Sequence, residues 1–271
     1  MHIFRPPVTS NQKDSAWDRI KNYVKEERPL QPIRKIVVKG SVDVVFRRSD
    51  KPMLIVAGEA ADAVASVKTY FNGEKLVIER EGMTISFGNS RMTFHGSVGS
   101  FVMGDIVNGK AMGTSISQGK VVVGVALPEA PAVKIKGSGD VTLLDLRQAG
   151  LDLEIEGSGD ITAYGQVAHL EVEIAGSGDV DASELIADRA SLSVAGSGDI
   201  EAFIRSEVRA RVAGAGDILV RGNPPHRDHS VAGSGKIKFR SEVQHDRSNQ
   251  SADRTRAASA GRQGRSDSFT T

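Results

Sequence analysis

The sequence predicts an all-β protein folded as a single-chain parallel β-solenoid, with coils of about 19–20 residues. Three observations predict this fold. The tetrapeptide Gly-Ser-Gly-Asp recurs at nearly constant spacing, the segment before each copy alternates between apolar and polar residues, and 29 glycines accompany few aromatic residues. Such a composition favours short strands joined by tight turns.

The repeat begins at residue 137. Gly-Ser-Gly-Asp occupies 137–140, 157–160, 176–179 and 196–199, Gly-Ala-Gly-Asp follows at 214–217, and Gly-Ser-Gly-Lys ends the series at 233–236. The spacing of 18–20 residues is too short for a repeat of two helices and is about twice that of the nine-residue calcium-binding repeat. One coil of a β-solenoid fits it.

Each segment before a motif alternates strictly, as a strand with one buried face does. The apolar positions are, unit by unit, Leu151, Leu153 and Ile155; Leu170, Val172 and Ile174; Leu192 and Val194; Val208 and Val212. The charged residues between them are Asp152, Glu154, Glu156, Glu171, Glu173, Arg209 and Arg211. We therefore expect the apolar side chains inside the coils and the charged ones outside.

The motif itself is expected to form the turn of each coil. Glycine suits a position where the chain turns against the core, because no side chain fits there or because the backbone needs a positive φ. The predicted turn glycines are Gly137, Gly139, Gly157, Gly159, Gly176, Gly178, Gly196, Gly198, Gly214, Gly216, Gly233 and Gly235. The serine and aspartate lie outside the turn, where both side chains can accept hydrogen bonds from free backbone N–H groups.

Stacking places the aspartates in one column. With coils roughly 4.8 Å apart, neighbouring carboxylates repel by about 1 kcal/mol in a water-like dielectric. Two interpretations stay open: each carboxylate caps a turn by accepting backbone N–H groups, or the column is a ladder that binds cations. The members are Asp140, Asp160, Asp179, Asp199 and Asp217, and Lys236 takes the equivalent place in the last unit.

Three regions are expected along the chain. Residues 1–30 form a polar segment with an amphipathic helix at 14–28, in which Trp17, Ile20 and Val24 make one apolar stripe before Pro29 ends it. This helix either covers an open end of the strands or docks on a partner. Residues 31–240 are expected to form one solenoid domain, since Gly40-Ser41-Val42-Asp43 is a degenerate motif and no linker interrupts them. Residues 241–271 are too polar to bury much surface, which predicts a disordered tail.

A family resemblance rests on the same residues. The opening Ile36-x-Val38-x-Gly40-Ser41-x-Asp43-Val44, the segment LPEAPAVKIKGSGDV and the serial GSGD units resemble the bacterial proteins known as putative auto-transporter adhesin, head GIN domain. The resemblance covers roughly residues 33–240. It implies a β-solenoid without known catalytic residues, an adhesin-like binding role and, for many members, export or a lipid anchor.

Few residues point to chemistry. His226, Asp228 and His229 are the one cluster with possible metal-ligand spacing, in a segment that reads as a surface loop without an obvious third ligand. The repeated serines have no recurring histidine beside them to activate a nucleophile. The outward carboxylates resemble a solvated face rather than the facing pair that glycoside hydrolysis needs. We therefore predict no enzyme and no cofactor, with a polysaccharide-active enzyme as the least favoured alternative.

The charges predict a bipolar surface. The totals of 35 basic and 34 acidic residues nearly balance, but acidic residues gather at 152–173 and basic ones at 205–240. Arg205, Arg209, Arg211 and Arg221 come without an aromatic platform, so nucleic acid is an unlikely partner. No apolar run reaches signal-peptide or membrane-span length and cysteine is absent, which predicts a cytoplasmic chain.

Two functions follow as hypotheses. The first is a non-enzymatic, adhesin-head-like module that presents a repetitive surface to a protein or glycan. The second is a cytoplasmic scaffold that forms homo-oligomers by stacking its coil ends, since an open end of a sheet presents unpaired backbone groups.

Overall fold

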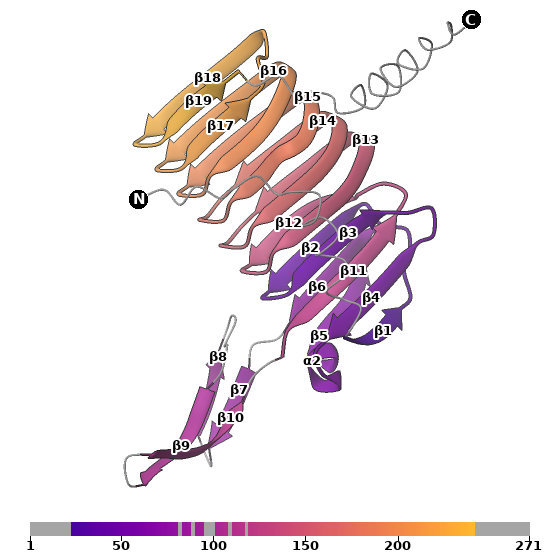
Figure 1. Cartoon of the computed structure of the whole chain (residues 1–271), viewed down its shortest axis with the longest axis vertical. Helices are drawn as coiled ribbons and strands as arrows, with labels where there is room; N and C mark the ends of the chain where they lie inside the picture. Colours follow the sequence, from indigo (N-terminus) through magenta and orange to yellow (C-terminus); the bar gives the residue numbers. More distant parts are fainter. Residues whose placement is uncertain are drawn as a thin grey trace, which may run out of the picture.

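The predicted parallel β-solenoid is confirmed by the computed structural model (Figure 1), which describes residues 23–80 and 119–241 together with four strands between them. Its repetitive part consists of β12 (Ala132–Gly137), β13 (Val141–Ile155), β14 (Ile161–Ile174), β15 (Val180–Gly196), β16 (Ile200–Gly214), β17 (Asp217–Arg221), β18 (His226–Gly233) and β19 (Lys236–Arg240). Neighbouring coils pair in parallel, so residues 18–20 positions apart in sequence stack on one another.

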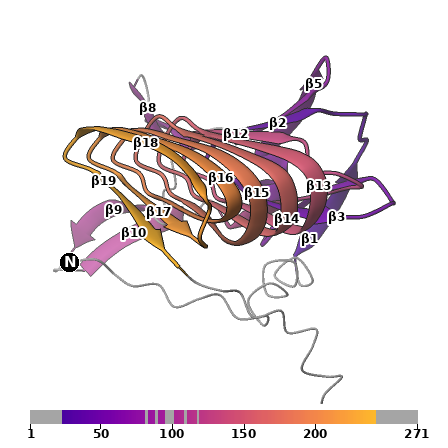
Figure 2. The ribbon, with the colours of Figure 1, turned by 90° about the horizontal axis from the view of Figure 1, so that it is seen from above.

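Each long strand runs along one side of the flattened coil, bends and returns along the other side (Figure 2). We call the two sides wall A and wall B. Wall A contains β12, residues 151–155 of β13, 169–174 of β14, 189–195 of β15, 207–213 of β16, and β18. Wall B contains residues 141–144 of β13, 161–164 of β14, 180–184 of β15, 200–204 of β16, β17 and β19.

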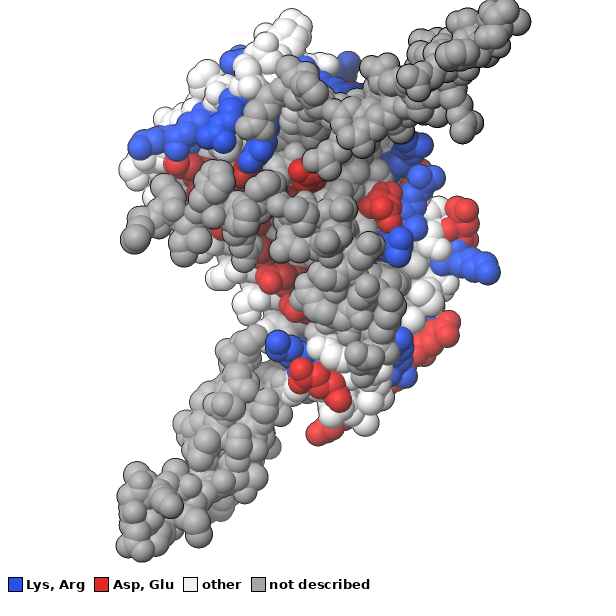
Figure 3. Space-filling model, viewed as in Figure 1, with Lys and Arg blue, Asp and Glu red and all other residues white. Residues whose placement is uncertain are grey.

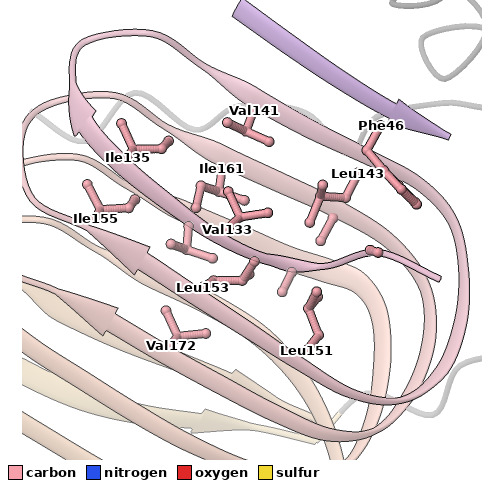
Figure 4. Packing of buried hydrophobic residues seen from close by; sticks show 14 of the residues in the cluster. Phe46, Val133, Ile135, Val141, Leu143, Leu151, Leu153, Ile155, Ile161 and Val172 are labelled. Carbon is pink, nitrogen blue, oxygen red and sulfur yellow. The ribbon is translucent and has the colours of Figure 1, made fainter. Parts of the chain in front are cut away.

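The core fills the space between the walls (Figure 4). Side chains of wall A point toward those of wall B, as Leu153 and Val141 do within one coil. Along the solenoid, identical positions stack: Leu153 pairs with Val172, and Ile155 pairs with Ile174. These side chains are almost completely buried, and each contributes roughly 1.5–3 kcal/mol relative to an exposed position.

Close stacking of the turns explains the glycines. A Cβ on Gly176 would lie 2.2 Å from the carbonyl oxygen of Gly157 in the preceding coil, and one on Gly178 would lie 2.1 Å from the carbonyl oxygen of Gly159. Both glycines are therefore required by the backbone of the neighbouring coil rather than by the core. Hydrogen bonds hold this approach, since the Ser177 N–H donates to the Gly157 carbonyl at 2.9 Å.

The N-terminal end continues both walls with less regular strands. β2 (Lys35–Gly40) and β6 (Lys75–Arg80) extend wall A in parallel, and β5 (Val67–Asn72) closes it with an antiparallel pairing. β3 (Asp43–Arg48), β11 (Val121–Leu127), β4 (Met53–Gly58) and β1 (Val24–Arg28) extend wall B, the last two through antiparallel pairs. A short helix, α2 (Ala61–Ala65), connects β4 to β5 and packs Val64 into the core.

Between β6 and β11 the chain leaves the large sheet. β7 (Met83–Phe87) pairs with β8 (Ser90–Phe94), and β9 (Phe101–Val107) pairs with β10 (Lys110–Ile116), each as a separate two-stranded antiparallel sheet (Figure 1). These four strands, which the sequence predicts within the solenoid of residues 31–240, therefore form two hairpins and not additional coils. The physical reason is local, because each pair is joined by a connection short enough for a hairpin.

The helix predicted at 14–28 is wrong where the structure can test it. Residues Val24–Arg28 form β1, which pairs antiparallel with β4, and Val24 remains about half exposed (48 %). The open backbone edge of β4 and the Arg28 guanidinium, which donates to the Val67 carbonyl at 2.8 Å, outweigh helix propensity there. Trp17 and Ile20 lie outside the described residues, as do residues 242–271 of the predicted tail. Among the described residues, no helix is long and apolar enough to cross a membrane.

Candidate binding wall

The outer side of wall A is a flat, exposed and charged surface. Its side chains stand in straight columns because the coils stack in register. From the N-terminal end, the outward positions carry Lys134 and Lys136; Asp152, Glu154 and Glu156; Glu171 and Glu173; Ser191 and Ser193; Arg209 and Arg211; Asp228 and Ser230. At these positions the wall changes from basic to acidic, neutral and basic again between β12 and β16. A further outward column carries His169, Arg189, Glu207 and His226.

The two glutamates of the first acidic band are paired with lysines of the same chain. Lys134 Nζ lies 2.5 Å from one carboxylate oxygen of Glu154 and 2.5 Å from one of Glu156, and Lys136 Nζ lies 2.7 Å from Glu156. Hydrogen bonds from Lys134 and Lys136 lower the pKa of Glu156 to about 2. Although partial burial acts in the opposite direction, hydrogen bonds from Lys134 and Lys35 also hold the pKa of Glu154 below its usual range.

The second acidic band and the distal arginines are different. Glu171, Glu173 and Arg211 are exposed and form no ion pair within the described residues. Arg209 contacts Glu207, at 3.4 Å between Nη2 and Oε1, with two thirds of its side chain (66 %) exposed. These charges are exposed to a partner, whereas the two glutamates of the first acidic band are already paired with lysines.

The outer side of wall B is unlike wall A near its N-terminal end. Val45, Val122, Leu144 and Tyr164 point outward from the sheet yet are buried, and Tyr23 and Ile55 pack on them. Burial, with a smaller effect of nearby Asp181 and Glu184, raises the pKa of the Tyr164 phenol to about 12. Farther along, Lys and Arg gather over the last strands (Figure 3).

The predicted aspartate column is present as one continuous hydrogen-bonded ladder. Asp160 Oδ1 accepts the backbone N–H of Asp179 at 3.0 Å, and Asp179 Oδ1 accepts that of Asp199 at 2.8 Å. The same contact joins Asp43 to Asp140, Asp140 to Asp160, Asp199 to Asp217, and Asp217 to Lys236. One oxygen of each carboxylate thus takes the place of a backbone acceptor at the turn, which is the geometry of the capping interpretation.

The candidate metal cluster does not converge. His226 to Gly233 is strand β18, paired in parallel with β16, and not the loop expected from its polar residues. Alternation along β18 places His226 and Asp228 outward and His229 inward, where its ring meets Phe239 edge-on at 5.4 Å. Arg227 also faces inward, 4.5 Å above the same ring. Across the described residues, no group of three His, Asp or Glu side chains has metal-binding geometry.

Some site residues escaped the sequence interpretation. The outward glutamates were recognisable from alternation, but their lysine partners were not, although a 20-residue offset aligns Lys134 with Glu154 and Lys136 with Glu156. The arginines do not form one patch, because Arg209 and Arg211 lie on wall A while Arg221 lies on wall B, beside Glu201.

Comparisons with known proteins identify the relatives of this fold. The family described as putative auto-transporter adhesin, head GIN domain, matches residues 33–224. A putative adhesin from Bacteroides fragilis NCTC 9343 superposes with a TM-score of 0.54 at 20% identity, covering 81% of this chain and 98% of its own. A putative lipid binding protein from Parabacteroides distasonis ATCC 8503 (TM-score 0.41, 19% identity, 81% and 97% covered) and a putative adhesin from Parabacteroides merdae ATCC 43184 (0.43, 12%, 81% and 97%) are less similar. No curated protein matches the chain.

Proposed function

The chain belongs to the putative auto-transporter adhesin, head GIN domain family, and on that premise we propose that it is a non-enzymatic binding module whose contact surface is wall A. The observation that carries the proposal is the exposed set of glutamates on β14 and wall A arginines on β16, of which only Arg209 has an ion-pair partner among the described residues, held in columns by the stacked coils. Exposed polar groups in fixed order on a flat sheet provide specificity toward a macromolecule rather than a pocket for a small one.

The same surface argues against catalysis on wall A. Glycoside hydrolysis needs two carboxyl groups that face each other across a cleft. Glu154 and Glu156 are instead paired with lysines, and Glu171 and Glu173 project from one strand into solvent. Binding without turnover is the function that this arrangement supports.

A panel of immobilised cell-surface polysaccharides and extracellular-matrix proteins tests the proposal. The full chain is expected to bind at least one member saturably, and E171Q/E173Q/R209Q/R211Q to lose that binding. The control K25Q/E27Q/D50N/K51Q changes the same number of exposed charges on β1 and after β3, and is expected to bind normally. Equal binding by the wall A variant would contradict the proposal, as would cleavage of a bound polysaccharide detected by mass spectrometry.

A self-assembling scaffold is the second candidate. The observation that favours it is β18, which is exposed along its whole length at the last described coil. Electron microscopy of the purified chain and cell fractionation separate the two functions. Filaments recovered from the cytoplasm would favour stacking of coil ends, and non-filamentous chain at the cell surface would favour the binding module.

A further inference from the structure

Wall A carries an ordered pattern of charge across three neighbouring strands. At two outward positions of each strand, β14 carries glutamate, β15 serine and β16 arginine. Two columns cross these strands: Glu171, Ser191 and Arg209 in one, and Glu173, Ser193 and Arg211 in the other. Within these two columns the pattern is antisymmetric about β15, because each acid on β14 has a base at the same position on β16. The adjoining column of His169, Arg189 and Glu207 does not follow this pattern.

The chain leaves most of this pattern without an internal partner. Strands β14 and β16 are two strand spacings apart, or roughly 9.6 Å, and among the described residues no ion pair joins their outward side chains, although Lys35 on β2 does reach Glu154 on β13 over the same spacing, at 3.0 Å. Arg209 contacts Glu207 on its own strand, at 3.4 Å. Where opposite charges sit on adjacent strands, as with Lys134 and Glu154, they do meet, at 2.5 Å. In these two columns the serines of β15 lie between the glutamates and the arginines, and both charged sets remain exposed.

We propose that the partner of wall A is wall A of a second copy, related by a two-fold axis that runs along β15; the proposal rests on the function of wall A given above. Rotation about this axis leaves each column in place and exchanges β14 with β16. Glu171 then faces Arg209 of the partner subunit, and Glu173 faces Arg211 of the partner subunit. Symmetry makes four such ion pairs, and a closed two-fold contact of identical surfaces is the usual form of a homodimer.

The centre of the wall permits close approach. Ser191 and Ser193 are small, and the adjoining column consists of Ala175, Ala195 and Ala213, all exposed. Five strands of about seven residues make a wall of about 24 × 24 Å, or roughly 1,150 Å² for two copies together. This area is near the lower limit of about 1,200 Å² for specific interfaces, so a reversible dimer is expected.

Two like-charge contacts also follow from this geometry. Arg189 lies on the axis and faces its own copy, although its own chain offers Glu207, 4.0 Å away between Nε and Oε2. At the rim, Asp152 faces Asp228 of the partner subunit, because the rotation exchanges β13 with β18. D228N removes this repulsion and is expected to tighten the dimer two- to five-fold, which a different arrangement of the two walls would not produce.

A charge-exchange experiment on the full chain tests the geometry by sedimentation velocity in about 50 mM salt. E171K/E173K and R209E/R211E are each expected to raise the dimer Kd more than tenfold. An equimolar mixture of the two is expected to form a heterodimer, because the altered β14 of one variant then faces the altered β16 of the other with opposite charge, and the two unaltered strands face each other as in the native dimer. Salt at about 0.5 M, which shortens the screening length to a few ångströms, is expected to weaken the native dimer.

Matched controls use exposed charges outside wall A. K25E/K51E and E27K/D50K reverse the same numbers of charges and are expected to dimerise as the native chain does. The inference would be overturned if the native chain stayed monomeric at 100 times the concentration used in the panel assay. It would also be overturned if the two wall A variants stayed monomeric when mixed. If wall A variants lose panel binding while the native chain is monomeric, the inference fails and the proposed function stands. If the wall A variants lose the dimer and keep panel binding, the inference stands and the proposed binding of other macromolecules by wall A fails.

Discussion

At the scale of single residues, the turns are governed by backbone proximity. Gly178 is not needed for an unusual φ; it is needed because the carbonyl oxygen of Gly159 occupies the place of a Cβ, and Ile155 Cγ2 lies within 3.1 Å of the same point. The neighbour is main chain and cannot rotate away. Any side chain must therefore separate two coils that are joined by hydrogen bonds on both sides of the turn.

Gly178→Ala is expected to destabilise the protein by at least about 2 kcal/mol, because the methyl group overpacks an interface of backbone atoms. Gly150→Ala is the control, since a Cβ there meets nothing within 4 Å. Urea denaturation followed by circular dichroism measures both free energies of unfolding. A loss for Gly178→Ala as small as that for Gly150→Ala would show that the coils separate easily.

The pKa of Glu156 predicts a defined pH dependence. Its folded value of about 2 lies below the usual 4.5, because Lys134 and Lys136 stabilise the carboxylate. The stabilisation is therefore complete above pH 4.5 and is lost as the pH falls toward 2. The difference in unfolding free energy between the native chain and Glu156→Gln is expected to narrow over this interval; Glu27→Gln, at an exposed position on β1, is the control. A difference that stays constant from pH 6 to 2 would contradict the assignment.

At the scale of elements, alternation was the reliable signal. Leu151, Leu153 and Ile155 defined both the strand and its buried face, and the register with Leu170, Val172 and Ile174 followed from the repeat length. Alternation failed as a signal where the same apolar spacing was compatible with both a helix and a strand. Val24 fits a helical stripe and also a strand edge, and only the open backbone of β4, far away in sequence, decides between them.

The outer surface was harder to predict for the same reason. Alternation predicts that Glu171 and Arg209 point outward, but whether either charge has an ion-pair partner depends on the residues of the neighbouring coils. The polar sequence of β18 carried no alternation, because its inward positions include Arg227 and His229, which pack on Phe239 instead of entering a continuous core. Local pattern thus identified the regular coils and not their last member.

A whole coil should be removable without loss of the fold. Deletion of residues 157–175 joins Glu156 to Gly176 and brings β13 against β15 in the register that β14 now occupies. We expect a folded chain with a lower urea m-value, because less surface is exposed on unfolding. Deletion of residues 157–166 removes half a coil and is expected to abolish folding. A half-coil deletion as stable as the full-coil deletion would refute repeat-by-repeat stacking.

At the scale of the whole molecule, the two walls have different surroundings. Wall B buries outward apolar side chains such as Val122 and Leu144 near its N-terminal end, whereas wall A exposes charge along its length. One rigid body therefore has one side suited to packing and one suited to reversible recognition. The inward residues that stabilise the fold, such as Ile155 and Ile174, are separate from the outward residues that would bind, so binding surfaces can change without loss of stability.

The aspartate ladder also gives the described coils a direction. Each aspartate carboxylate accepts the backbone N–H of the equivalent aspartate in the next coil, so all these hydrogen bonds point the same way along the solenoid. The backbone N–H of Lys236 donates to the Asp217 carboxylate, but the Lys236 side chain carries an ammonium group where the other coils carry a carboxylate. At this position the last described coil therefore presents a positive charge instead of a carboxylate acceptor.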